Sequence, residues 1–300
     1  MQITLHDGST ADLAEFGPKE IDQLHWDQER AFASRIRQSP KGSEERAFAF
    51  RDGYDTVTQI LAWRDRATER GLVMGYNPRY VRLVTKLLRR HRHGSTPTPR
   101  FFEIGYGSGA MLEAVVREGF DVGGVEVSSF MQQQAMVRLP EPHHAGLLLG
   151  DFLTMDLAAW QGTHVAYWND VLEHLPQDES LDFVRRVHDL LAPGGVLVTI
   201  TPNWHMRPMD VTSMMKPPRS EAEGFHLKEH TLGEVRDLLR RAGFARVATP
   251  LFVTRQTTAL FGNGLCGVKC LIEPALERLP FRLAALACRG GGLTTTLAWK

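Results

Sequence analysis

The sequence predicts an α/β fold in which helices cover both faces of a mostly parallel, seven-stranded sheet. From residue 101 to about residue 253, short apolar strands alternate with longer helical segments, as a parallel sheet with crossover helices requires. A glycine-rich loop, 105–109, follows the first strand and opens a helix. Acidic residues stand where the first three strands end, at the edge where open α/β sheets bind ligands. We therefore expect a doubly wound sheet.

The first section, residues 1–94, is expected to form a helical extension. Asn77 and Pro78 predict a helix start, because Asn caps helix N-termini and Pro is favoured at the first helical position. Apolar residues then recur at helical spacing, and we expect this helix to end near Gly94. A Ser-, Thr- and Pro-rich stretch, 94–99, links this section to the sheet.

The central section supplies most of the sheet. Its helices are expected to begin near Gly109, Ser129, Asp178 and Thr231. The helix from Asp178 carries apolar residues on one face and is expected to end at the Pro-Gly-Gly of 193–195. The expected strands are 101–104, 122–127, 146–150, 165–169, 196–201 and 244–253.

The last section continues the sheet domain, 95–300, through an apolar insertion at about 261–290. The Leu- and Ala-rich part of this insertion, 272–287, is expected to be helical, and the β-prone end, 293–299, to return as the final strand. For the insertion we favour packing in the core. The alternatives are a cover for the active site, a dimer contact and a peripheral membrane contact.

The charge balance bears on the kind of partner. Lys plus Arg and Asp plus Glu number 35 each, so no net field attracts nucleic acid or an acidic membrane surface. We interpret the basic run 89–93 as the cationic end of a helix, which complements the helix dipole, and not as a phosphate site. These features favour a small, largely uncharged partner and no nucleic acid.

The location and the cysteines follow from similar arguments. The N-terminus lacks the basic and apolar regions of a secretory signal, and no apolar run is long enough to span a membrane, so we expect a cytoplasmic protein. Cys266, Cys270 and Cys288 form no even-numbered framework and are expected to be free thiols. Two thiols without nearby His or further Cys do not predict a metal site.

The glycine loop allows a ligand to approach the main chain, because glycine has no side chain. Its pattern, Gly105-x-Gly107-x-x-Ala110, also satisfies the dinucleotide fingerprint. Glu126 lies at about the distance where an acid binds a ribose hydroxyl pair. Taken alone, the loop therefore leaves an NAD(P)-dependent oxidoreductase open.

Acids near the loop favour another cofactor. Glu103 precedes the first glycine by two residues, where its charge would repel a pyrophosphate and attract the ammonium of an amino acid. S-adenosylmethionine (SAM) carries such an ammonium. Glu126 can accept hydrogen bonds from both ribose hydroxyls. Asp151 follows the third strand, where its carboxylate can accept from an adenine amino group while Phe152 packs on the base.

With these features, the sequence resembles the class I SAM-dependent methyltransferases, a Rossmann-like fold, particularly the broad subgroup that includes the ubiquinone-biosynthesis O-methyltransferases. The motifs that carry the resemblance are 101–109, 124–128, 150–152, 169–176, 191–195, 230–232 and 242–244, within a match from 100 to about 253. The resemblance implies a SAM-dependent methyltransferase and SAM contacts at Glu103, Gly105, Gly107, Gly109, Glu126, Asp151 and Phe152, plus a main-chain contact near Asn169.

Methyl transfer to a hydroxyl also requires a general base, most often His. His174, His226 and His230 are the candidates, and His174 ranks first because it follows the fourth strand beside the expected sulfonium. Each could instead pack or cap the structure. Asp170, Glu173 and His174 could together hold a divalent ion, as is suspected of the ubiquinone enzymes, but we favour no metal, because the same residues could cap a helix.

The leading interpretation is a SAM-dependent methyltransferase, favouring O-methylation of a small molecule, a glycan or a lipid-linked intermediate. Two alternatives stay open. An NAD(P)-dependent oxidoreductase fits the glycine pattern but lacks a Tyr-x-x-x-Lys pair, and a SAM-binding protein without catalysis would keep the same cofactor residues.

Overall fold

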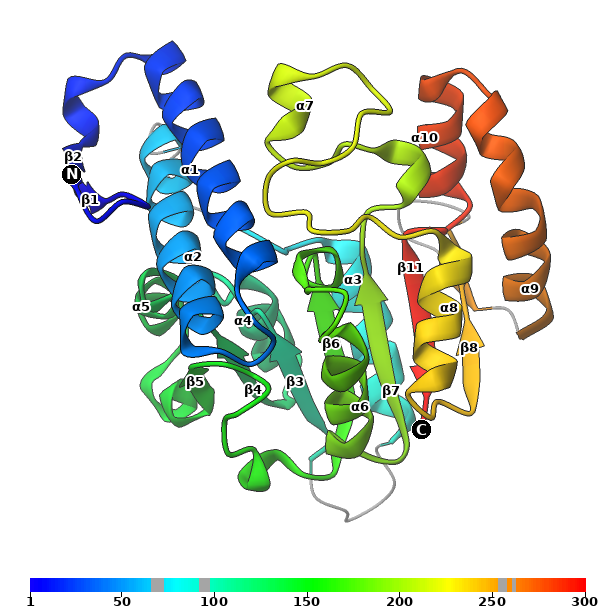
Figure 1. Ribbon diagram of the computed structural model, residues 1–300. Helices are drawn as coiled ribbons and strands as arrows, with labels where there is room; N and C mark the ends of the chain where they lie inside the picture. The colour runs from blue at the N-terminus through cyan, green and yellow to red at the C-terminus, as the bar shows by residue number, and fades with distance from the viewer. Residues whose placement is uncertain (66–72, 92–97, 253–257, 261–262) are drawn as a thin grey trace.

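A seven-stranded sheet forms the centre of the molecule (Figure 1). The computed structural model describes residues 1–65, 73–91, 98–252, 258–260 and 263–300. The strand order is β5-β4-β3-β6-β7-β11-β8. The strands from β5 to β7 run parallel, whereas β11 is antiparallel to both β7 and β8. This confirms the predicted fold class and the return of the chain end to the sheet. The strands are β3 (Arg100–Ile104), β4 (Asp121–Glu126), β5 (Leu147–Leu149), β6 (Thr163–Asn169), β7 (Leu191–Ile200), β8 (Arg246–Ala248) and β11 (Thr295–Trp299).

Alternate residues of the strands supply a core on each face of the sheet. On β3, Phe102 packs in the cluster that contains Trp168, while its neighbour Phe101 packs in the cluster that contains Tyr167. Figure 1 shows α6 and α8 in front of the sheet and α3 behind it. The helices around the sheet are α3 (Pro78–Arg90), α4 (Ala110–Arg117), α5 (Ser129–Arg138), α6 (Ser180–Leu190) and α8 (Leu232–Arg241).

Helix starts follow the capping residues of the sequence. The Asn77 side chain accepts a hydrogen bond from the backbone N–H of Arg79 and caps α3. The hydroxyl of Thr231 and the carboxylate of Glu234 form a capping box at the start of α8. The apolar face of α3 packs in the same core as β3 and β6, so this helix is an integral layer of the sheet structure.

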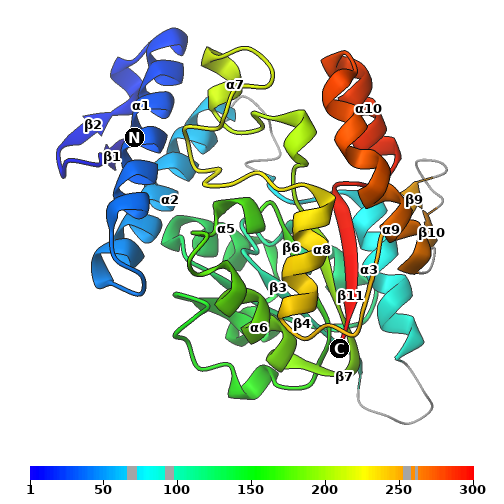
Figure 2. The ribbon, with the colours of Figure 1, turned by 45° about the vertical axis from the view of Figure 1, so that its right-hand side comes forward.

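The N-terminal section begins with an antiparallel hairpin that we did not expect, made by β1 (Gln2–Thr4) and β2 (Thr10–Asp12). Strands of three residues are too short to show an alternating pattern in the sequence. The short helix η1 (Leu13–Glu15) precedes two long helices, α1 (Pro18–Gln38) and α2 (Glu44–Asp65). Figures 1 and 2 both show α1 and α2 side by side at one end of the sheet.

The prediction of one continuous helix over 272–287 is wrong, because this stretch is divided. Helix α9 (Asn263–Ile272) ends before a 3-10 turn, η6 (Glu273–Arg278), and α10 (Phe281–Gly290) then begins after Pro280. Pro274 and Pro280 each lack a backbone N–H, which explains the break. Across the described residues, no helix combines the length and apolarity needed to span a membrane.

The predicted strand 244–253 is also divided. Strand β8 ends at Ala248, and β9 (Pro250–Phe252) pairs with β10 (Thr258–Leu260) outside the central sheet. Val253, the last residue of that prediction, lies outside the described residues. Other boundaries shift by a few residues: β5 occupies the middle of 146–150, α6 begins at Ser180, and β7 begins before the Pro-Gly-Gly of 193–195.

Candidate active site

Three glycines turn the chain from β3 into α4. Gly105, Gly107 and Gly109 have φ angles of 70°, 50° and 72°, in the left-handed region that other residues rarely adopt. A Cβ atom on Gly105 would lie 2.8 Å from Cγ2 of Val171. The first position of the loop therefore requires glycine both for its backbone angle and for lack of space.

The Glu126 carboxylate joins the end of β4 to the glycine loop. Its Oε2 accepts a hydrogen bond from the backbone N–H of Gly107 at 2.8 Å, and its Oε1 accepts from Val127 and Ser128, both at 2.9 Å. Burial raises the pKa of this carboxyl, although the three N–H groups oppose the rise. These bonds hold the carboxylate against the loop.

Glu103 is a buried carboxyl one strand away. The residue is only 2% exposed, and its Oε2 has no hydrogen-bond partner among the described residues. Burial, and next the negative charge of Glu126, raise the pKa of Glu103 well above its usual range. Because a buried polar atom without a partner is costly, this oxygen fits a cationic or hydrogen-bonding group of a ligand.

The remaining predicted cofactor residues follow β5 and β6. The Asp151 carboxylate accepts a hydrogen bond from the backbone N–H of Leu153 at 2.8 Å. Phe152 is buried, with its ring stacked on Phe183 at a centroid distance of 5.8 Å. Asn169 ends β6, and its side-chain amide donates to Asp170 at 2.8 Å. Asp170 itself has φ of 54°, a strained angle of the kind that clusters at functional sites.

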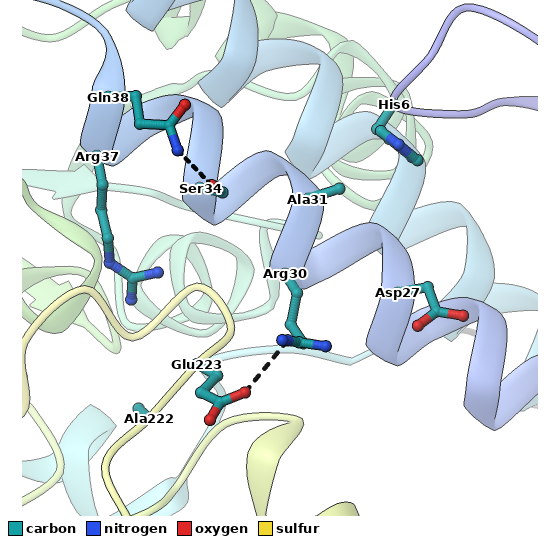
Figure 3. A pocket seen from close by; sticks show the side chains of 9 residues that line it. All are labelled: His6, Asp27, Arg30, Ala31, Ser34, Arg37, Gln38, Ala222 and Glu223. Atoms are coloured by element: carbon teal, nitrogen blue, oxygen red, sulfur yellow. Dashed lines mark hydrogen bonds and ion pairs between the residues drawn. The ribbon is translucent and has the colours of Figure 1, made fainter.

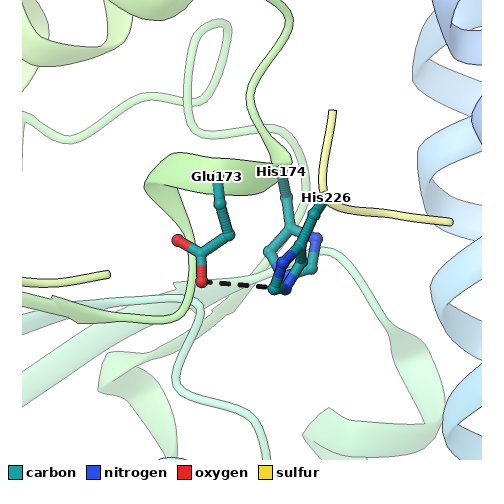
Figure 4. Close-up of side chains that lie close together, drawn as sticks. All are labelled: Glu173, His174 and His226. Atoms are coloured by element: carbon teal, nitrogen blue, oxygen red, sulfur yellow. Dashed lines mark ion pairs between the residues drawn. The ribbon is translucent and has the colours of Figure 1, made fainter. Parts of the chain in front are cut away.

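Glu173, His174 and His226 lie close together (Figure 4), the first two on the short helix η4 (Leu172–His174) and the third on a distant segment. One ligand atom of each lies within 4.8 Å of the others. Thr201 donates a hydrogen bond to Glu173 Oε2 at 2.9 Å, while Glu173 Oε1 has no partner within hydrogen-bond distance among the described residues. Burial, and next the charge of Asp170, raise the pKa of Glu173 to about 8.

The two histidines of this cluster differ in protonation. The imidazole of His174 has Nδ1 at 2.9 Å from the carbonyl oxygen of Phe225, and burial together with the charge of His226 lowers its pKa to about 3. Burial also opposes charge on His226, but the 2.8 Å hydrogen bond between its Nδ1 and Glu229 and the nearby Glu173 outweigh burial and raise the pKa to about 9. The cluster therefore contains a neutral imidazole beside a charged one.

His230 lies outside this cluster. Its backbone forms an isolated bridge with Asn203, just before α8. The side chain is buried, its Nε2 has no hydrogen-bond partner among the described residues, and burial lowers its pKa to about 4. Of the three candidate histidines, the structure thus brings together His174 and His226.

Helix α2 contributes two residues that sequence reasoning missed. Tyr54 stacks on Phe225 at 5.0 Å between ring centroids and meets His174 edge-on at 5.7 Å. The Asp55 carboxylate accepts hydrogen bonds from the hydroxyls of Ser128 and Ser129, at 2.6 and 2.9 Å, and from the next backbone N–H at 3.1 Å. Asp55 thereby attaches the N-terminal section to the turn that carries Glu126. No local sequence signal indicates either contact.

An open cavity of about 640 Å³ lies between α1 and the segment around Glu223 (Figure 3). Arg30 crosses it to form a 3.2 Å ion pair with Glu223, and Arg37 donates to the carbonyl oxygens of Gly224 and His226. None of the predicted cofactor residues and none of the three candidate histidines lines this cavity. We therefore centre the site on the glycine loop and the Glu173 cluster.

Comparison with known proteins decides between the interpretations of the glycine loop. A family model described as a methyltransferase domain matches residues 63–249, more than half of the chain. The chain belongs to this methyltransferase family. No curated protein matches its sequence.

Several solved structures resemble the enzyme. The CcbJ methyltransferase from Streptomyces caelestis is 25% identical, with a TM-score of 0.37, over 44% of this chain and 51% of that chain. The enzyme thus spans about half the length of that protein. Magnesium protoporphyrin IX methyltransferase from Synechocystis PCC 6803 is 18% identical, with a TM-score of 0.48, over 70% and 95% of the two chains. A SAM-dependent methyltransferase from Archaeoglobus fulgidus is 16% identical, with a TM-score of 0.43, over 73% and 94%.

SAM is the cofactor of the enzyme, and the residues at the glycine loop fit it. The unpaired oxygen of Glu103 suits the ammonium of SAM, and the glycines leave the main chain free for close approach. A pyrophosphate at the same loop would meet two carboxyls, those of Glu103 and Glu126. The oxidoreductase alternative is therefore not favoured.

Proposed function

We propose that the enzyme transfers the methyl group of SAM to a hydroxyl of a small molecule, a glycan or a lipid-linked intermediate, as an O-methyltransferase. The observation that carries this proposal is the hydrogen bond of His174 Nδ1 to the Phe225 carbonyl oxygen, in the Glu173 cluster. Since only a protonated Nδ1 can donate to the Phe225 carbonyl, Nε2 of His174 keeps its lone pair and can accept a proton. A hydroxyl acceptor must lose a proton during transfer, and an imidazole at its side provides the acceptor.

Glu173 complements His174 in this scheme. Its pKa of about 8 allows it to hold a proton near neutral pH, and its Oε1 has no hydrogen-bond partner among the described residues. Above about pH 8, where the Glu173 carboxyl is ionised, it can take up the proton that His174 accepts from the hydroxyl. His226, fixed by Glu229, keeps a positive charge next to Glu173 and limits the repulsion between the acids.

The cofactor assignments are part of the same proposal. SAM supplies the sulfonium methyl when bound, and the protein binds and orients it. We assign Glu103 to the ammonium, Glu126 to the ribose hydroxyls, Asp151 and Phe152 to the adenine, and the main chain of Gly105, Gly107, Gly109 and Asn169 to further contacts. The motif series in the sequence supports placing the enzyme beside the ubiquinone-biosynthesis O-methyltransferases. We assign residues 1–94, whose last helix α3 also packs on the sheet, to an extension that shapes the acceptor side, the side of the active site that binds the methyl acceptor.

Transfer of labelled methyl groups from SAM into fractionated cell extract tests both the activity and the acceptor class. We expect label in a product whose bond to the methyl group is an ether. Replacing His174 by Ala should lower kcat about a hundredfold or more while leaving the Kd of S-adenosylhomocysteine unchanged. His143→Ala serves as a matched control, because His143 lies on the distant turn η2 (Glu141–Gly146). Full activity of His174→Ala would refute the assigned role, and no transfer into any fraction would favour a SAM-binding protein without catalysis.

An amine acceptor is a second candidate, and one observation favours it. Glu173 Oε1 and Glu229 Oε2 are buried on either side of His226 without hydrogen-bond partners among the described residues, and they could accept hydrogen bonds from the N–H groups of an amine. Label recovered in an N-methyl product would establish this alternative. In that case His174→Ala should lower activity most strongly at low pH, where the amine must first lose its proton.

A further inference from the structure

The outward face of α10 combines leucines with arginines. Leu283 and Leu286 are exposed, Leu286 to 68%. Arg282 and Arg289 are also exposed, and because Leu286 lies four positions after Arg282 and three before Arg289, these side chains share one face of the helix. The opposite face, with Ala284, Ala285 and Cys288, is buried against the body of the protein. The exposed leucines are therefore not needed to hold the helix in place.

Helix α9 continues this apolar surface. Val268, Leu271 and Ile272 are all exposed, Leu271 to 82%. Its cation, Lys269, points inward, where it donates hydrogen bonds to the hydroxyl of Thr249 at 2.6 Å and to a backbone carbonyl. Figures 1 and 2 both place α9 and α10 at the edge of the molecule, beyond the end of the sheet.

The charge on this surface is one-sided, although the chain as a whole has none. Arg278, Arg282 and Arg289 are exposed, and none forms an ion pair within the part of the chain that the structure describes. The acids of the same segment are used elsewhere. Glu273 accepts hydrogen bonds from the backbone at the start of α8, and Glu277 pairs with Arg207 at 2.8 Å.

We propose that the outward face of α9 and α10 docks on an anionic lipid bilayer. Exposed leucines can enter the interface between headgroups and acyl chains, while arginines extend their charged ends to anionic headgroups. The alternative occupant, a second copy of the chain, fits poorly, because a two-fold contact would bring unpaired arginines against one another without an acid between them.

The position of this surface relates it to the active site. Asn203 and Arg207, in the segment that follows β7, bind Glu273 and Glu277 of the apolar insertion. Both views show α10 and α7 (Thr212–Met215) at the same end of the molecule, beyond the carboxyl ends of the parallel strands. A docked enzyme would thus bring the acceptor side near the lipid. This last step rests on the proposed function, whereas docking itself does not.

Vesicle flotation with the full chain tests the docking without any methyl transfer. The probes are vesicles of phosphatidylcholine alone and of phosphatidylcholine mixed with phosphatidylglycerol. We expect binding to the anionic vesicles only, and a decrease as salt is raised. The double variant Leu283→Ser/Leu286→Ser should bind the anionic vesicles with an affinity that is lower by at least about tenfold. Val137→Ser is the matched control, because Val137 is 88% exposed on α5 and far from this surface in the sequence.

The outcomes separate the alternatives. Absence of flotation, or equal flotation of the double variant, would overturn the proposal. A wild-type dimer that the double variant abolishes, without vesicle binding, would identify a second copy as the occupant. If thermal unfolding shows that the double variant is misfolded, Arg282→Glu gives the same test by charge. Transfer of labelled methyl groups from SAM, measured without vesicles, tests the proposed function separately.

Discussion

Replacing Asp55 by Ala tests whether the N-terminal section is part of the cofactor site. The substitution removes the acceptor for three hydrogen bonds at the start of α5, next to the Glu126 turn. It also removes a negative charge from a helix N-terminus, where the dipole favours it. The backbone that positions Glu126 then loses its connection to α2.

The magnitude follows from the number and exposure of these bonds. A hydrogen bond to a charged group contributes about 1.5–3 kcal/mol, and water can replace part of it because Asp55 is only half-buried. We therefore expect a loss of about 2–3 kcal/mol in the free energy of unfolding. If about half of this loss is felt at the Glu126 turn, the Kd of S-adenosylhomocysteine should rise about tenfold, since each 1.4 kcal/mol changes affinity by that factor.

Isothermal titration calorimetry with S-adenosylhomocysteine and denaturant unfolding measure the two quantities. Asp52→Ala is the matched control, because Asp52 lies on the same helix and pairs only with its exposed neighbour Arg51 among the described residues. The control should change neither quantity by more than about 0.5 kcal/mol. A folded Asp55→Ala protein with an unchanged Kd would refute the view that α2 supports the cofactor site.

Three further predictions concern the buried charges. Glu103→Gln should raise the Kd of SAM about tenfold, as the ammonium loses a carboxyl that can ionise beside it, without lowering the free energy of unfolding; equal calorimetric affinities would contradict the assignment. The raised pKa of His226 contributes up to about 3 kcal/mol of stability that is complete below pH 6.5 and lost as pH rises through about 9, so unfolding midpoints should fall over that range and do so less in His226→Gln. Chelator treatment should leave activity mostly intact, because a protonated His226 is a poor ligand; complete loss restored by Mg²⁺ would show a metal requirement.

The part of the fold that could be predicted from the sequence is the part built from local patterns. Glu103 and Glu126 stand at the ends of apolar strands, and parallel strands bring such ends to one edge of a sheet. The contact of Glu126 with Gly107, on the neighbouring strand-to-helix loop, follows from that topology. Thr231 and Asn77 likewise predicted helix starts, because capping acts within one turn.

The errors have equally local causes. The hairpin of residues 2–12 has strands of only three residues, below the length at which alternation is visible. The break between α9 and α10 did have a signal, because Pro274 and Pro280 interrupt the apolar run, but the Leu and Ala content outweighed it in our interpretation.

The acceptor side could not be predicted, because it depends on contacts between residues far apart in the chain. Tyr54 and Phe225 stack although about 170 positions separate them, and the same Phe225 provides the carbonyl that fixes His174. No periodicity or motif relates α2 to this segment. The role of Glu173 was likewise hidden, since its raised pKa arises from burial that only the folded chain creates.

The cofactor side and the acceptor side of the active site should differ in how much amino-acid substitution they tolerate. The glycine loop that we assign to the cofactor depends on left-handed backbone angles and close packing, which tolerate little substitution. The Tyr54–Phe225 pair instead joins two segments by side-chain packing and lies against the imidazole that we assign to the acceptor. A smaller residue at position 54 should therefore enlarge the acceptor side and alter the choice of substrate while Asp55 keeps the cofactor turn in place.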